Sequence, residues 1–169
     1  KKFSHTKNYK LYFFYGWLFG FGYFVTNLYW ISISLTFDKN FQSLIPLTIF
    51  LIPAFIASFY GLTSLFFFIF KTKKIISSFF VFSIVFGILE YIRGNIFTGF
   101  PWNLIAYSFS DQLSIISVIS LFGTYGFNLF CISLFTSPAL IFLKKSKKTI
   151  IFLISFLTIF IFFNFYGLN

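Results

Sequence analysis

Short polar joints divide the chain into long apolar runs. Each run approaches or exceeds the ~20 residues that a membrane-spanning helix needs. The runs cover approximately 11–36, 44–70, 75–93, 114–143 and 149–166. The pattern predicts an all-α, polytopic membrane helix bundle with about five transmembrane helices, forming a single transmembrane domain over 1–169.

Helix-breaking residues predict kinks in two of these helices. Pro53 lies inside the second run, where it removes a backbone hydrogen bond and bends the helix. The fourth run is about 45 Å long as one helix, which exceeds a single crossing. Because Gly123 and Gly126 interrupt it, we expect a short interfacial helix near 113–122 and then a spanning helix, bent by Pro138.

The composition supports a membrane protein. Hydrophobic residues make up 59% of the chain and charged residues 9%, and the mean hydropathy is +0.92. A soluble domain carries about 25% charged residues, so a soluble domain with one anchor is excluded. Since the sequence contains no Met, we expect it to be a fragment of a longer protein.

The net charge of +10 matches a membrane topology better than nucleic-acid binding. If the N-terminus is cytoplasmic and the chain crosses five times, 11 of the 13 basic residues fall inside, as the positive-inside rule requires. These are Lys1, Lys2, Lys7, Lys10, Lys71, Lys73, Lys74, Lys144, Lys145, Lys147 and Lys148. We therefore expect no nucleic-acid partner, an outer loop at 94–113 and a periplasmic C-terminus of this chain.

Two opposite charges lie at the end of the third run. Glu90 and Arg93 are three residues apart, so on a helix they share a face and can pair. Charge at membrane depth is costly and indicates a functional site. Two interpretations stay open: an ion pair that fixes the helix end, or a pair whose Arg93 also meets an anionic lipid headgroup.

The residues that follow predict a stiff turn at the membrane surface. Gly94 and Gly99 permit unusual backbone conformations, and Pro101 pushes Phe100 into an extended one. Trp102 is then an interfacial anchor, or together with Phe100 and Pro101 it lines an entrance for a lipid substrate.

Glycines in two runs are candidates for close helix packing. The first run contains Gly16, Gly20 and Gly22, and the fourth contains Gly123 and Gly126. Small residues spaced four apart let another helix approach closely. Glycines are also simply tolerated in membrane helices, and the sequence leaves both interpretations open.

Candidates for chemistry are few. Cys131 lies between apolar neighbours with no base in its run, so it is not expected to be a nucleophile. One Cys with one His, His5, makes a metal site improbable, and no cofactor motif is present. We expect no cofactor and no metal.

Three motifs resemble a known family. Leu-Glu-x-x-Arg-Gly begins at Leu89 and is followed by Thr-Gly-Phe-Pro-Trp at 98–102, a combination that resembles the signature of bacterial apolipoprotein N-acyltransferases. The segments 16–22 and 28–31 together resemble an early membrane helix of that family, and the segment 123–128 resembles a later one. The three motifs come in the family's order.

The resemblance implies a transferase of lipoprotein biosynthesis in the bacterial inner membrane. Such an enzyme moves an acyl chain from a phospholipid to the N-terminal diacylglyceryl-cysteine amine of lipoprotein precursors. It has eight spanning helices and a periplasmic nitrilase-like domain with a Glu-Lys-Cys triad. This chain would supply the third to seventh helices, with the nitrilase-like domain separately encoded or missing. We therefore expect no catalytic residue in this chain and no activity from it alone.

The residues expected to line lipid access are Glu90, Arg93, Phe100, Pro101, Trp102 and Tyr107. A small multi-pass transporter or channel subunit is one alternative, and a structural membrane protein is another. Transport favours ionisable residues near the bilayer midplane. The runs here are nearly free of charge, and Asn27 and Asn128 are their only notable amides.

Overall fold

The computed structural model describes residues 8–96, 99 and 101–168, and these residues form helices, turns and loops with no strand. Five helical segments are long and apolar enough to cross a membrane. They are Tyr9–Thr36, Gln42–Phe70, Ile75–Asn95, Ile119–Leu143 and Lys147–Leu168. The expected all-helical, multi-pass membrane fold is confirmed.

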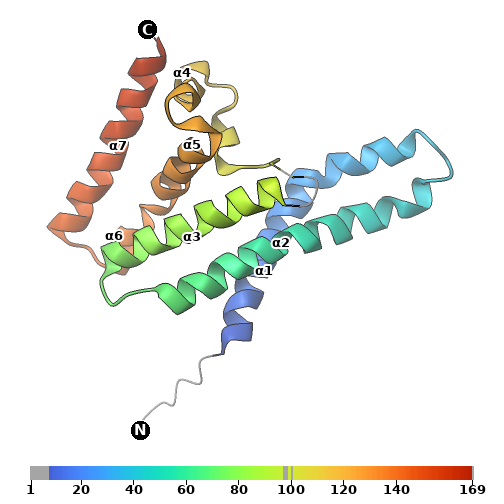
Figure 1. Cartoon of the computed structure of the whole chain (residues 1–169), viewed down its shortest axis with the longest axis horizontal. Coiled ribbons are helices and arrows are strands. Elements are labelled where there is room, and N and C mark those ends of the chain that lie inside the picture. The colour runs from blue at the N-terminus through green and yellow to red at the C-terminus, as the bar shows by residue number, and fades with distance from the viewer. Residues whose placement is uncertain (1–7, 97–98, 100, 169) are drawn as a thin grey trace. The chain divides into compact units, whose positions relative to one another are not determined.

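The first part of the chain, described from residue 8 to residue 69, is a helical hairpin (Figure 1). Helix α1 (Tyr9–Leu28) continues as the 3-10 helix η1 (Tyr29–Thr36), and a turn leads through η2 (Gln42–Leu44) into α2 (Ile45–Phe70). A Cβ atom at Gly16 would overlap the Tyr60 carbonyl oxygen of α2, and one at Gly20 would lie 2.7 Å from the Tyr60 Cβ. The two helices therefore touch along their backbones at these glycines.

The first apolar run is not one α-helix, because its last third is a 3-10 helix. In η1 the hydroxyl groups of Ser32, Ser34 and Thr36 each donate to the carbonyl three residues earlier, at 2.6–2.7 Å. These side chains compete for the carbonyls of the turn. The tighter 3-10 winding is compatible with such bonds.

The second part, from residue 70 onward, contains the remaining helices. After α3 (Ile75–Asn95) come η3 (Ile105–Phe109), α4 (Leu113–Ile116), α5 (Ile119–Thr136), α6 (Ala139–Leu143) and α7 (Lys147–Leu168). Helix α3 packs against α5, and α4 packs against the end of α7 (Figure 1). One apolar cluster joins η3, α4, α5 and α7; its buried members are Ala106, Phe109, Ile115, Val118, Phe127, Cys131, Leu134 and Phe163.

The fourth apolar run is broken at Gly123 and at Pro138, as predicted, but α5 continues through Gly126, and the pieces are shorter than expected. Instead of one helix over 113–122, the structure has the single turn α4 and the first turn of α5. Gly123 has φ 70° and ψ 167°, which interrupts α5 because only glycine adopts this conformation easily. Pro138 separates α5 from α6, whereas α2 continues through Pro53.

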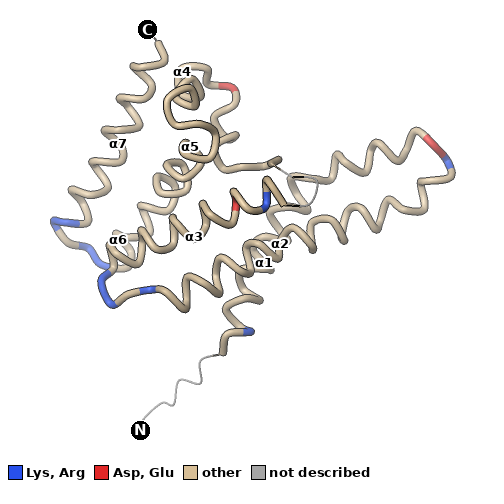
Figure 2. Tube along the Cα trace, in the orientation of Figure 1, with Lys and Arg blue, Asp and Glu red and all other residues tan. Residues whose placement is uncertain are grey.

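Charges separate along the second part of the chain (Figure 2). The lysines of 71–74 and of 144–148 lie where α3 and α7 begin, at one end of this part. The acidic positions of this part, drawn in red, lie away from these lysines. The lysines and the acidic residues of this part therefore lie in different regions.

Candidate functional site: a buried ion pair and the loop it holds

Glu90 and Arg93 form a buried, two-bond ion pair on the last turns of α3. The Arg93 Nη2 donates to Glu90 Oε2 at 2.7 Å, and Nε donates to Oε1 at 3.1 Å. Their exposed fractions are 1% and 2%. Paired N–H groups on a carboxylate are the strongest arrangement these groups make, which offsets part of the cost of burying both charges.

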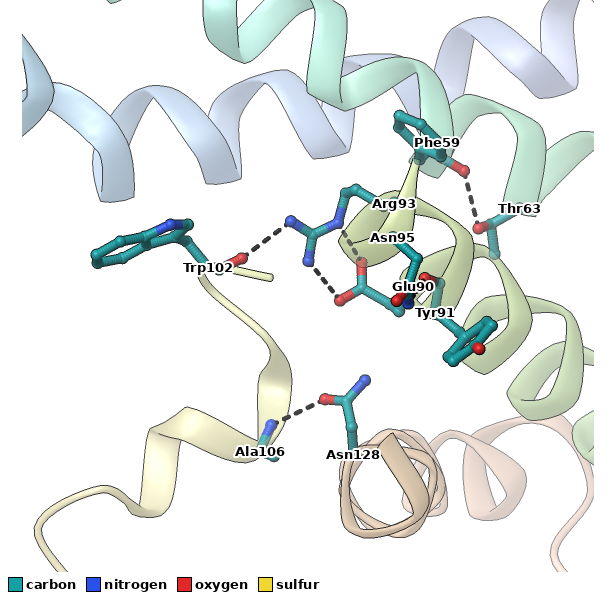
Figure 3. A network of polar contacts seen from close by, with 9 residues as sticks. All are labelled: Phe59, Thr63, Glu90, Tyr91, Arg93, Asn95, Trp102, Ala106 and Asn128. Carbon is teal, nitrogen blue, oxygen red and sulfur yellow. Dashed lines mark hydrogen bonds and ion pairs between the residues drawn. The ribbon is translucent and has the colours of Figure 1, made fainter. Parts of the chain in front are cut away.

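Arg93 also reaches across the loop. Its Nη1 donates to the Trp102 carbonyl oxygen at 2.9 Å, nine residues along the chain (Figure 3). The guanidinium therefore joins the end of α3 to the far side of the turn. Since Arg93 is almost fully buried and directed at these partners, the geometry favours the ion pair that fixes the helix end over a contact with a lipid headgroup.

The two glycines of the loop are needed for its shape. The Tyr125 hydroxyl of α5 occupies the space where a side chain at Gly94 would lie. Gly99 has φ 76° and donates its N–H to the Ile96 carbonyl at 2.9 Å. A Cβ there would also lie 2.8 Å from the Gly94 carbonyl oxygen. A tight backbone turn therefore closes against the end of α3.

Beyond the turn, side chains separate into a buried and an exposed set. Trp102 is 52% exposed and Tyr107 39%, and Pro101 is exposed too, whereas Leu104 and Ala106 are buried. Phe100 lies outside the described residues. The loop thus presents aromatic rings outward while its backbone is fixed from behind.

Sequence reasoning gave Asn128 no role in the site, and the structure places it directly behind the loop. Its Oδ1 accepts the backbone N–H of Ala106 at 3.0 Å, across 22 residues (Figure 3). The side chain is 1% exposed, and its Nδ2 has no hydrogen-bond partner within the described part of the chain. Its sequence signals were an amide inside an apolar run and a place at the end of the 123–128 motif.

An apolar groove lies between α3, α5 and α7. Its volume is about 430 Å³, and phenylalanines dominate its walls, with small residues between them. The lining residues are Phe80, Ser83, Ile84, Phe122, Gly126, Leu129, Phe130, Ser133, Phe156 and Phe163. A groove of this size and lining suits hydrocarbon.

The remaining residues considered in the sequence are Cys131, the possible metal ligands and the glycines. Cys131 is 0% exposed in the apolar cluster. The described residues contain no group of three or more His, Cys, Asp or Glu side chains that could hold a metal. A Cβ at Gly22 or Gly123 would meet nothing within 4 Å, so close helix packing does not explain those two glycines. One at Gly126 would meet only Phe122 of its own helix.

Comparisons with known proteins agree on one family. The family described as "Apolipoprotein N-acyltransferase N-terminal domain" matches residues 3–137. The apolipoprotein N-acyltransferase of Rickettsia prowazekii is 36% identical over 142 residues, which is 83% of this chain and 28% of that protein. That of Brucella melitensis is 35% identical over 127 residues, 75% of this chain and 24% of that protein. That of Rhodopseudomonas palustris is 37% identical over 129 residues, with the same two shares.

No solved structure matches the chain. The chain spans about a quarter of the length of these relatives. The family match covers most of the chain, and it includes the ion pair, the loop and Asn128. This multi-pass membrane chain therefore belongs to the apolipoprotein N-acyltransferase family, to the part described as its N-terminal domain.

Proposed function

We propose that the chain is the membrane portion of an enzyme that acylates lipoproteins. The reaction would transfer an acyl chain from a phospholipid to the N-terminal diacylglyceryl-cysteine amine of a lipoprotein precursor. Family membership supports the reaction class. The observation that carries the role of this portion is the loop whose backbone Arg93 fixes at Trp102, while the Trp102 and Tyr107 rings stay exposed.

In this proposal the loop forms one side of the lipid access path. Glu90 and Arg93 act from behind it, and the side chains of Phe100, Pro101, Trp102 and Tyr107 meet the lipid. Indole and phenol rings favour the headgroup level of a bilayer. A fixed loop would hold donor and acceptor near the reacting group, which removes the search in solution that a bimolecular reaction requires.

Catalysis would need a nitrilase-like domain with its own nucleophile, and this chain alone would be inactive. Cys131 is fully buried in the apolar cluster and has no access to a substrate. The direct test reconstitutes the chain with and without such a domain and measures acyl transfer to a lipoprotein peptide. Transfer by the chain alone would contradict this division of roles.

We expect Trp102→Ala in the intact enzyme to slow acyl transfer about tenfold, because a displaced substrate loses the orientation that the loop provides. Membrane insertion should not change, since the Trp102 anchor is a backbone carbonyl. The matched control is Trp30→Ala, which removes another exposed tryptophan, from η1. Equal rates for Trp102→Ala and the parent enzyme would remove Trp102 from the access path.

We further propose that the N-terminus is cytoplasmic and the 94–113 loop periplasmic, in the inner membrane of a bacterium. In intact cells a membrane-impermeant thiol reagent should label Ser108→Cys in the loop, and Lys145→Cys only after permeabilisation. Both positions are exposed, and Cys131 is buried. Labelling of both positions from the same side would refute this topology.

A further inference from the structure

The 94–113 loop is fastened at two backbone atoms by two different helices. Arg93 of α3 holds the Trp102 carbonyl, and Asn128 of α5 holds the Ala106 N–H. We propose that Asn128 is a positioning residue for the loop and forms, with Arg93, a two-point clamp that sets where the Trp102 and Tyr107 rings lie.

Asn128 lies where the first turn of η3 lacks a hydrogen-bond acceptor. The first N–H groups of a helix have no partner within the helix, and a side chain at the preceding residue usually accepts them. That residue here is Leu104, which makes no capping hydrogen bond. The Ala106 N–H is 0% exposed, so water does not replace the missing cap. Asn128 supplies the cap from another helix.

Only one half of the Asn128 amide is used. Its Oδ1 meets the Ala106 N–H, while Nδ2 is directed away from Ala106 and has no partner in the described structure (Figure 3). A buried donor without a partner is costly. The hydrogen bond that Oδ1 accepts from Ala106 is therefore the contribution this amide makes to the fold.

The clamp acts on the residues that carry the exposed rings. Trp102 is itself anchored through its carbonyl, and Tyr107 follows the anchored N–H of Ala106 directly. Between the two anchors Leu104 turns inward and is 1% exposed. With both ends of this short segment fixed, the backbone that carries the two rings cannot shift far without breaking one of these hydrogen bonds. This inference rests on the proposed function only where it assigns the loop to lipid access.

Thiol labelling of two cysteines can distinguish local release of the loop from unfolding of the whole protein. Ala106→Cys places a thiol at the buried face of the loop and keeps the backbone N–H, while the native Cys131 reports on the helix core. In lipid nanodiscs, the labelling rate of each thiol by a maleimide is read by mass spectrometry. Asn128→Leu should raise labelling at position 106 about tenfold and leave Cys131 protected, because losing one buried hydrogen bond shifts local opening by that order.

A second variant and a matched control test the chemistry. Asn128→Asp keeps an acceptor oxygen in the same place, so labelling at position 106 should be clearly slower than in Asn128→Leu. Asn27→Leu removes the amide from α1, where its hydrogen bonds to described residues stay within its own stretch of helix, and should change neither rate.

The clamp is overturned by any of three results. They are an unchanged rate at position 106 in Asn128→Leu, equal rates for the Leu and Asp variants, or Cys131 labelled in parallel, which would make Asn128 a general packing residue. Because no arm measures acyl transfer, failure of the clamp leaves the proposed function to its own test.

Discussion

Glu90→Leu should destabilise the folded protein by about 3–5 kcal/mol, because it leaves the Arg93 guanidinium buried without its carboxylate. Arginine stays protonated in proteins, so the stranded charge cannot be removed by loss of a proton. Arg93 is 2% exposed, and both of its bonds to Glu90 would be lost. Only the bond to Trp102 and the remaining local contacts would hold it.

The double variant Glu90→Leu with Arg93→Leu should recover most of this loss. Replacing both partners of a buried pair by apolar residues is often close to neutral, while removing one is not. What stays lost is the anchor at the Trp102 carbonyl. The double variant should therefore fold with a stability near that of the parent, but with a looser loop.

A double-mutant cycle measures the pair directly. Unfolding of the parent, both single variants and the double variant is followed in detergent, and the coupling energy should exceed about 2 kcal/mol. Asp111→Leu is the control, because Asp111 is an exposed acid in the same part of the chain. Additive losses in the cycle would show that the two charges contribute independently, contrary to the geometry.

This pair is also where the sequence was most informative. Two opposite charges three residues apart on an apolar helix share a face and have no other charged partner nearby in the sequence. The ion pair can therefore be predicted from the spacing. The five spanning segments are equally local, since each is a run of apolar residues long enough for a bilayer. Features that depend on one helix are within reach of sequence reasoning.

The second anchor of the loop could not be predicted in this way. Asn128 and Ala106 are 22 residues apart, and hydropathy shows Asn128 only as a polar residue in an apolar run. Its role depends on which face of α5 meets η3 and on Leu104 being unable to cap. Phenylalanine and isoleucine cover every face of these helices, so the pattern does not indicate the packing side.

The glycines of α1 show what helix geometry adds to a prediction from sequence. Gly16 and Gly20 are four residues apart and share a face, while Gly22 lies about 200° around the helix from Gly20. The structure places the first two against α2 and leaves open space at the third. Spacing thus distinguishes a contact glycine from a tolerated one, although it does not name the partner helix.

Gly16→Leu should therefore separate the α1–α2 hairpin, with a loss of about 3 kcal/mol or more. The added Cβ would overlap the backbone carbonyl of Tyr60, and a backbone atom cannot move aside without moving α2. Separation would also break the hydrogen bond from Trp17 Nε1 to the Ala54 carbonyl, 2.9 Å long. Small residues permit such close contacts in membranes, where packing replaces the hydrophobic effect.

Gly22→Leu is the matched control, because it adds the same side chain to the same helix where nothing lies within 4 Å. It should be neutral or slightly stabilising, since leucine favours a helix by about 1 kcal/mol over glycine. The measurement is unfolding in detergent together with cross-linking between cysteines placed on α1 and α2. Equal losses for the two variants would mean that leucine disturbs α1 itself, and that the backbone contact at Gly16 does not hold the hairpin.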